Sequence, residues 1–128
     1  MSTITVTNIQ ATGETASRAV SGVAAAWVDI GVGGSSVGDS VNVASLVDVG
    51  TGDYTINFTN NMSSVYYSGV TTLTHDTVNA TQNHRSMQGQ SKAASNFQVN
   101  GTYIDANGVF NLWDIETSGS ATIHGDLA

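Results

Sequence analysis

The sequence predicts an all-β chain of about eight strands that forms an antiparallel β-sandwich or a small jelly-roll-like domain. Apolar and polar residues alternate on both sides of glycine-bearing turns, as they do in β-hairpins. Val, Thr, Ile and Tyr, which favour strands, are common, whereas helix signals are scarce. Proline is absent, so Gly, Asn and Asp must form the turns.

The first predicted hairpin joins a strand over Val41–Val49 to a strand over Asp53–Thr59. One face of the second strand carries the large apolar residues Tyr54, Ile56 and Phe58. Gly50-Thr51-Gly52 connects the strands, and short glycine-containing loops close hairpins of this kind. We therefore expect this apolar face to lie in the core.

A second hairpin is predicted nearer the C-terminus, from Phe97–Tyr103 to Val109–Glu116. Its turn is Asp105-Ala106-Asn107-Gly108, and an Asn-Gly pair reaches positive φ at little cost. Large aromatic residues of the chain that are expected in the core are Trp27, Tyr54, Phe58, Phe97 and Trp113.

Further strands are expected at Ile4–Ile9, Val23–Ile30, Ser64–Leu73 and Ser120–Gly125. Gly31–Ser40 and Asp76–Ala94 show no strand pattern and are predicted to be loops. Residues 1–19 are interpreted as an N-terminal attachment segment with the first strand, and residues 20–128 as the sandwich domain.

The charge balance argues against a nucleic-acid partner. The chain has 128 residues and a net charge of −7, with three basic residues, Arg18, Arg85 and Lys92. Binding to nucleic acid requires Lys and Arg to neutralise phosphates, and binding to an anionic membrane surface needs them too. We also expect no membrane insertion, because no apolar run approaches the length of a membrane span. No cysteine and no signal-peptide pattern are present, which favours a bacterial-type cytoplasm with release by lysis.

Residue types that carry chemistry are present but do not form a recognisable pattern. The spacing of His75, Asp76, His84 and His124 matches no zinc motif, although one histidine per chain could meet on the axis of a trimer. Asp105–Gly108 resembles the start of a calcium loop but lacks the distal ligands. Glycosidases act with a pair of carboxylates, and the residues considered for that role are Glu14, Asp29, Asp114 and Glu116. A Gly-x-Ser-x-Gly nucleophile motif is absent. We expect no catalytic, cofactor or metal site.

Five residues are predicted to make intermolecular contacts: Tyr66, Tyr67, His84, Arg85 and Lys92. Because the two tyrosines are adjacent, one of them must point away from the core. An exposed tyrosine suits stacking on a sugar or packing against a neighbouring subunit. The other three lie in the predicted loop Asp76–Ala94, where they are expected to meet acidic groups on a glycan or on another copy.

The central segment shows a distinctive order of short motifs. Ala26-Trp27-Val28 precedes the Gly-rich stretch, and the Ser-x-Asn-Val-x-Ser pattern Ser40–Ser45 follows it. This leads into Gly50-Thr51-Gly52-Asp53-Tyr54-Thr55-Ile56-Asn57-Phe58, then Met62 and Tyr66-Tyr67. The order resembles a β-domain common in fibre proteins of tailed bacteriophages, well over Val20–Val70 and loosely in the last third.

The resemblance implies a β-sandwich that assembles as a homotrimer on the virion, touches other virion proteins and contacts a host surface glycan or protein. The expected function is multivalent attachment to the host, in which several weak contacts add up. The alternative is a non-adhesive capsid, neck or tail decoration protein that stabilises the particle. In both cases the expected location is the virion, assembled in the cytoplasm of a bacterial host and released by lysis.

Overall fold

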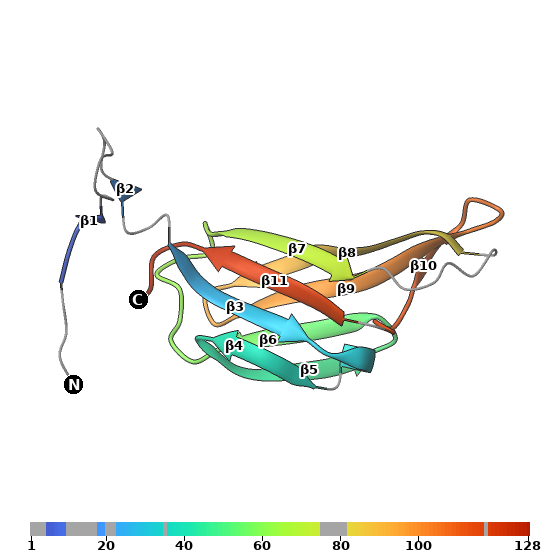
Figure 1. The fold of residues 1–128 in the computed structure, drawn as a ribbon, viewed down its shortest axis with the longest axis horizontal. Coiled ribbons are helices and arrows are strands. Elements are labelled where there is room, and N and C mark those ends of the chain that lie inside the picture. The colour runs from blue at the N-terminus through green and yellow to red at the C-terminus, as the bar shows by residue number, and fades with distance from the viewer. Residues whose placement is uncertain (1–4, 10–17, 20–22, 35, 75–81, 117) are drawn as a thin grey trace.

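The computed structural model describes residues 5–9, 18–19, 23–34, 36–74, 82–116 and 118–128. Two antiparallel sheets, one of four strands and one of five, pack face to face, which confirms the predicted all-β sandwich (Figure 1). β1 (Asn8–Ile9) and β2 (Arg18–Ala19) pair with each other. Of the strand predicted over Ile4–Ile9, only Asn8–Ile9 is a strand, because residues 5–7 are described and lie outside any strand.

The four-stranded sheet has the order β4–β3–β11–β7. Its strands are β4 (Val37–Val41), β3 (Ala24–Ile30), β11 (Ser118–His124) and β7 (Ser68–Thr74). β3 and β11 confirm two predicted strands, but β7 begins four residues after the predicted Ser64. The preceding residues are used differently: Met62 forms an isolated bridge to Leu127, and Tyr67 turns into the core.

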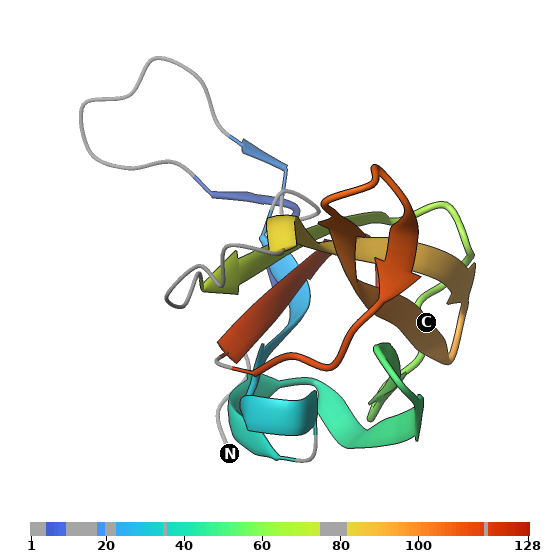
Figure 2. The same cartoon turned by 90° about the vertical axis from the view of Figure 1, so that its right-hand side faces the viewer.

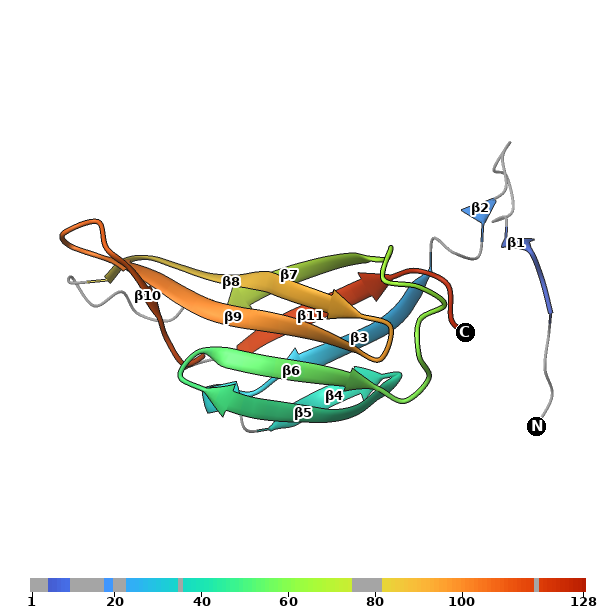
Figure 3. The same ribbon diagram turned by 180° about the vertical axis from the view of Figure 1, so that it is seen from behind.

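The five-stranded sheet is built around β9 and faces the viewer in Figure 3. Its strands are β5 (Val43–Gly50), β6 (Asp53–Phe58), β8 (Gln82–Ala93), β9 (Asn96–Asp105) and β10 (Phe110–Leu112). β8 pairs with β9 along one edge. Along the other edge, β9 pairs first with β6 and then, over Thr102–Ile104, with β10. β9 therefore holds three other strands in register.

The first predicted hairpin is present, and the second is present in part, because its second strand, predicted over Val109–Glu116, is limited to Phe110–Leu112. In β6, Tyr54, Ile56 and Phe58 are buried, which confirms the face assigned to the core. Gly52 in the connecting turn has φ +66°, a conformation that glycine adopts without strain. In the second hairpin, Asp105 accepts hydrogen bonds from the N–H groups of Asn107 and Val109 at 2.9 Å each, so this acidic loop is a hairpin turn.

The prediction of a loop over Asp76–Ala94 was wrong from Gln82 onward, because those residues form β8. Residues 76–81 lie outside the described residues. β8 shows no apolar periodicity, since Met87 is its single buried apolar residue among those whose burial is described. Its strand conformation comes from pairing with β9, a long-range contribution that local patterns do not reveal.

The prediction of a loop over Gly31–Ser40 was also only partly right. Val32–Gly34 forms a short 3₁₀ turn, and β4 then begins at Val37. β4 pairs with β3, with Trp27 opposite Val41 and Val28 opposite Ser40. Small side chains concealed this strand in the sequence, because Gly38 and Ser40 contribute little to any apolar pattern.

Figure 2 shows that the sheets approach each other at two sides of the sandwich, β4 beside β5 and β7 beside β8. At the first side the chain passes from β4 into β5 through Asn42, which has φ +56°. At the second side the Thr71 hydroxyl donates a hydrogen bond of 2.6 Å to the Met87 carbonyl. The core thus lies between sheets that are linked along both margins.

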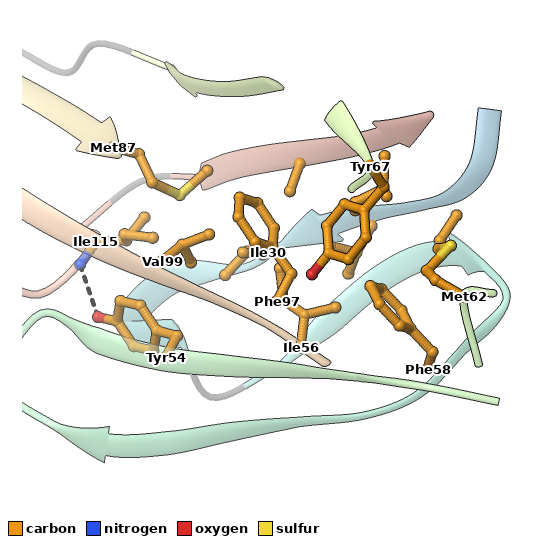
Figure 4. Close-up of a cluster of buried hydrophobic side chains, with 14 residues drawn as sticks. Ile30, Tyr54, Ile56, Phe58, Met62, Tyr67, Met87, Phe97, Val99 and Ile115 are labelled. Atoms are coloured by element: carbon orange, nitrogen blue, oxygen red, sulfur yellow. Dashed lines mark hydrogen bonds between the residues drawn. The ribbon is translucent and has the colours of Figure 1, made fainter. Parts of the chain in front are cut away.

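Phe97 sits in the middle of this core (Figure 4). Gly69 of β7 and Gly89 of β8 flank its ring, and a Cβ at either glycine would lie 2.7 Å from Phe97 Cζ. Of the aromatic residues predicted to be buried, Tyr54, Phe58, Phe97 and Trp113 are buried. Trp27 is half-buried on the outer face of β3, because its neighbours Ala26 and Val28 occupy the inner face.

Candidate functional site

Arg85 points inward from β8. Its guanidinium carbon lies 4.2 Å from the centre of the Trp113 ring, and Nη1 is 3.4 Å from Glu116 Oε2. The side chain is 6% exposed. This position contradicts the predicted role of Arg85 as a contact residue, because its charged end already packs between an aromatic ring and a carboxylate.

Lys92 lies at the other end of β8 and is exposed. Its Nζ donates a hydrogen bond of 2.7 Å to the Tyr67 carbonyl and is 5.4 Å from the centre of the Tyr67 ring. Along β9, Lys92 is opposite Phe97, whereas Arg85 is opposite Tyr103 and His84 is opposite Ile104. The strand therefore separates Lys92 from the other two positions, and the cationic loop predicted from the sequence does not form.

The two adjacent tyrosines point in opposite directions, as predicted. Tyr66 is 94% exposed and remains a candidate contact residue, whereas Tyr67 is 4% exposed and belongs to the core. The Tyr67 hydroxyl is 2.7 Å from the Asn96 carbonyl oxygen and 3.2 Å from that of Ala93. Burial raises the pKa of Tyr67 to about 12. Tyr67 thus holds the β8–β9 turn and is not available to a partner.

The carboxylate of Asp114 has a structural role. Its Oδ1 accepts hydrogen bonds from the Gly52 N–H at 2.6 Å and from the Tyr54 hydroxyl at 3.3 Å. The Tyr54 hydroxyl oxygen accepts a bond of 3.1 Å from the Ile115 N–H (Figure 4). Burial, which exceeds the opposing effect of the Ile115 hydrogen bond, raises the pKa of Tyr54 to about 12. These bonds tie the first hairpin to the segment after β10.

The other residues considered for chemistry are dispersed. Glu116 pairs with Arg85, and Asp29 is exposed on β3. Glu14, His75 and Asp76 lie outside the described residues. Within the part of the chain that is described, no three His, Cys, Asp or Glu residues are grouped to hold a metal ion. The same residues contain no helix long and apolar enough to cross a membrane.

A depression of about 310 Å³ opens on the outer face of the five-stranded sheet. We call it the outer-face depression; it is lined by Asp53, Gln88, Gly89, Gln90, Asn100, Thr102, Phe110 and Leu112. Strand pairing brings these residues together, since Asn100 is opposite Asp53 on one side and Gln88 on the other. Sequence reasoning missed this site because β8 was not recognised as a strand.

No family model, curated protein or solved structure matches the chain. Its function is therefore inferred from its own residues. The outer-face depression combines amides, one carboxylate and two exposed apolar side chains, Phe110 and Leu112. Such a combination can bind an amphipathic ligand by hydrogen bonds and by apolar contact.

Proposed function

We propose that the chain is a structural protein of a tailed-bacteriophage virion, where it acts as a trimeric, fibre-type adhesin that attaches to the host surface. The observation that carries the proposal is the resemblance of Gly50–Phe58 to the hairpin of such fibre domains. Residues of this hairpin have defined places in the sandwich: Gly52 makes the turn, and Tyr54, Ile56 and Phe58 enter the core. The resemblance therefore concerns residues that build the fold.

The outer face of the five-stranded sheet is consistent with a protein that works by surface contact. Asn57 donates a hydrogen bond of 3.0 Å to Ser45, and Gln98 donates one of 3.4 Å to Thr55. The Ser91 hydroxyl donates to Gln98 Oε1. These cross-strand bonds between uncharged groups hold a polar surface in place, which lowers the entropic cost of binding. Several copies on one particle would add their weak contacts.

The alternative role, a decoration protein that stabilises the particle, is favoured by a different surface. The outer face of the four-stranded sheet carries a row of directly paired residues, one from each strand: Val41, Trp27, Thr122 and Val70. Val41 is 47% exposed and Val70 is 55% exposed. A flat row with two exposed valines and a half-buried tryptophan suits packing against another virion protein.

Antibody labelling of intact particles of the encoding phage, viewed by electron microscopy, tests the proposal. Label on fibres or tail tips supports the adhesin, and label spread over the capsid or neck supports the decoration protein. Particles that carry no label, and no peptide of this chain by mass spectrometry, would contradict both roles. Light scattering of the purified chain tests the trimer, and a stable monomer at micromolar concentration would refute it.

A further inference from the structure

We propose that the outer-face depression is a binding site for a neutral saccharide. The amides and the carboxylate would hydrogen-bond to sugar hydroxyls, and the two apolar side chains would pack against the carbon-bound hydrogens of the ring. This inference deepens the adhesin role by naming a site and a ligand class, and it rests on that role for its biological setting. Unpaired polar groups, apolar side chains and charge support the site independently of that role.

Three polar side chains in the depression lack hydrogen-bond partners among the described residues. Asp53 Oδ1 is buried yet accepts no hydrogen bond, and the side-chain amides of Gln90 and Asn100 form none. Because Oδ1 is covered from solvent, a ligand in the depression would meet the other oxygen of the Asp53 carboxylate. A sugar hydroxyl can donate to the carboxylate, and neighbouring hydroxyls can donate to or accept from the amides.

Apolar side chains border these polar groups on one side. Phe110 is 57% exposed and Leu112 is 49% exposed, and both come from β10. Leu112 is paired with Thr102, which is buried in the depression and bonded to Ser86 at 2.9 Å. An aromatic ring beside convergent hydrogen-bonding groups is the arrangement expected for a ligand that is polar at its edge and apolar on its face.

Charge selects a neutral saccharide over an acidic one. Asp53 is the only lining residue that ionises, and the chain as a whole carries a net charge of −7. Neither Arg85 nor Lys92 lines the depression: Arg85 is paired with Glu116, and Lys92 bonds to the Tyr67 carbonyl. A sugar carboxylate would therefore meet repulsion without a compensating cation.

The test is nuclear magnetic resonance titration of the ¹⁵N-labelled full chain with defined oligosaccharides. The probes are neutral hexamers of glucose, mannose, galactose and xylose, with oligogalacturonate as the acidic control. At least one neutral probe should produce saturable shifts at the side-chain amides of Gln88, Gln90 and Asn100. Phe110→Ala and Asn100→Ala should each weaken that binding about tenfold or more.

Val49→Ala is the control, because it removes an apolar side chain that is 59% exposed and lies outside the depression. It should bind the saccharide like the parent. No saturable shift with any neutral probe up to about 10 mM would overturn the inference, as would preference for the acidic probe. Loss of binding in Val49→Ala but not in Phe110→Ala would overturn it too.

The virion role and the saccharide site are tested by different experiments, so one can fail without the other. If the antibody labels the virion but the purified chain binds no saccharide, the saccharide site is refuted and the virion role stands. Saccharide binding at the depression by a chain that is absent from particles would refute the virion role and leave the site standing.

Discussion

Replacing Arg85 by alanine should destabilise the protein, because the arginine is a packed part of the sandwich. The guanidinium lies over the Trp113 ring at 4.2 Å and faces Glu116, and the side chain is 6% exposed. Truncation removes the cation from the ring and also uncovers Trp113, which is 8% exposed in the intact protein. The long aliphatic part of the arginine is lost with its contacts.

The expected loss is about 2–3 kcal/mol of unfolding free energy. A desolvated cation–π contact contributes roughly 1–2 kcal/mol. The ion pair adds about 0.5 kcal/mol, since Glu116 is 57% exposed and solvent screens it. Lost packing of the aliphatic stem accounts for the remainder. Arg85→Lys keeps the charge but not the planar group, so its loss should be about half as large.

Urea denaturation at one fixed protein concentration measures this difference. Glu116→Gln is the control for the ion pair and should cost less than about 1 kcal/mol. Val70→Ala, at an exposed position on the other sheet, should cost within about 0.5 kcal/mol. If Arg85→Ala also stays within about 0.5 kcal/mol of the parent, the guanidinium is not packed as described.

Four further outcomes are expected. Phe58→Ala should cost about 3–5 kcal/mol because the ring is buried, and an unchanged melting temperature would contradict its place in the core. Gly52→Ala should lower the free energy of unfolding more than Gly108→Ala does. Both glycines have positive φ, but a Cβ at Gly52 would lie 2.6 Å from the Gly101 oxygen, whereas a Cβ at Gly108 would meet open space. Equal losses in denaturant unfolding would count against the close approach at Gly52. Tyr54 and Tyr67 have pKa values of about 12 in the folded protein against 10.0 for an ordinary tyrosine, so the unfolded chain loses these protons first as the pH rises. The free energy of unfolding should therefore fall between about pH 10 and 12, and below pH 10 these two residues should give it no pH dependence. An ultraviolet titration in which all tyrosines of the folded protein ionise near pH 10 would be inconsistent with that burial. Chelation with EDTA should leave the melting temperature unchanged, and a large decrease would reveal a metal site.

The parts of the fold that were predicted correctly depend on local information. The β5–β6 hairpin was readable because Tyr54, Ile56 and Phe58 alternate with polar residues and glycines mark the turn. β8 was not readable, because Met87 is its single buried apolar residue among those whose burial is described. Its conformation depends on β9, to which it pairs along its length. A polar segment of this kind looks like a loop until its partner strand is known.

Some candidate contact residues are exposed and others are buried, and the sequence did not distinguish them because burial depends on distant partners. The alternation expected for a strand predicted that Tyr66 and Tyr67 face opposite ways, although both precede β7, and it did not show which of them is buried. The burial of Arg85 depends on Trp113, which reaches it from beyond β10. The outer-face depression needs four strands in register, so the roles of Gln90, Asn100 and Phe110 could not be foreseen from alternation alone.

Competition for adsorption tests the adhesin role most directly. Under the proposed function, host cells are incubated with the purified chain and then exposed, with the chain still present, to a phage that encodes it, and the rate of phage adsorption is measured. The parent chain and Val49→Ala should slow adsorption in a dose-dependent way, whereas Phe110→Ala and Asn100→Ala should compete only weakly. Adsorption that is unaffected by saturating parent chain would contradict attachment as the function of this protein.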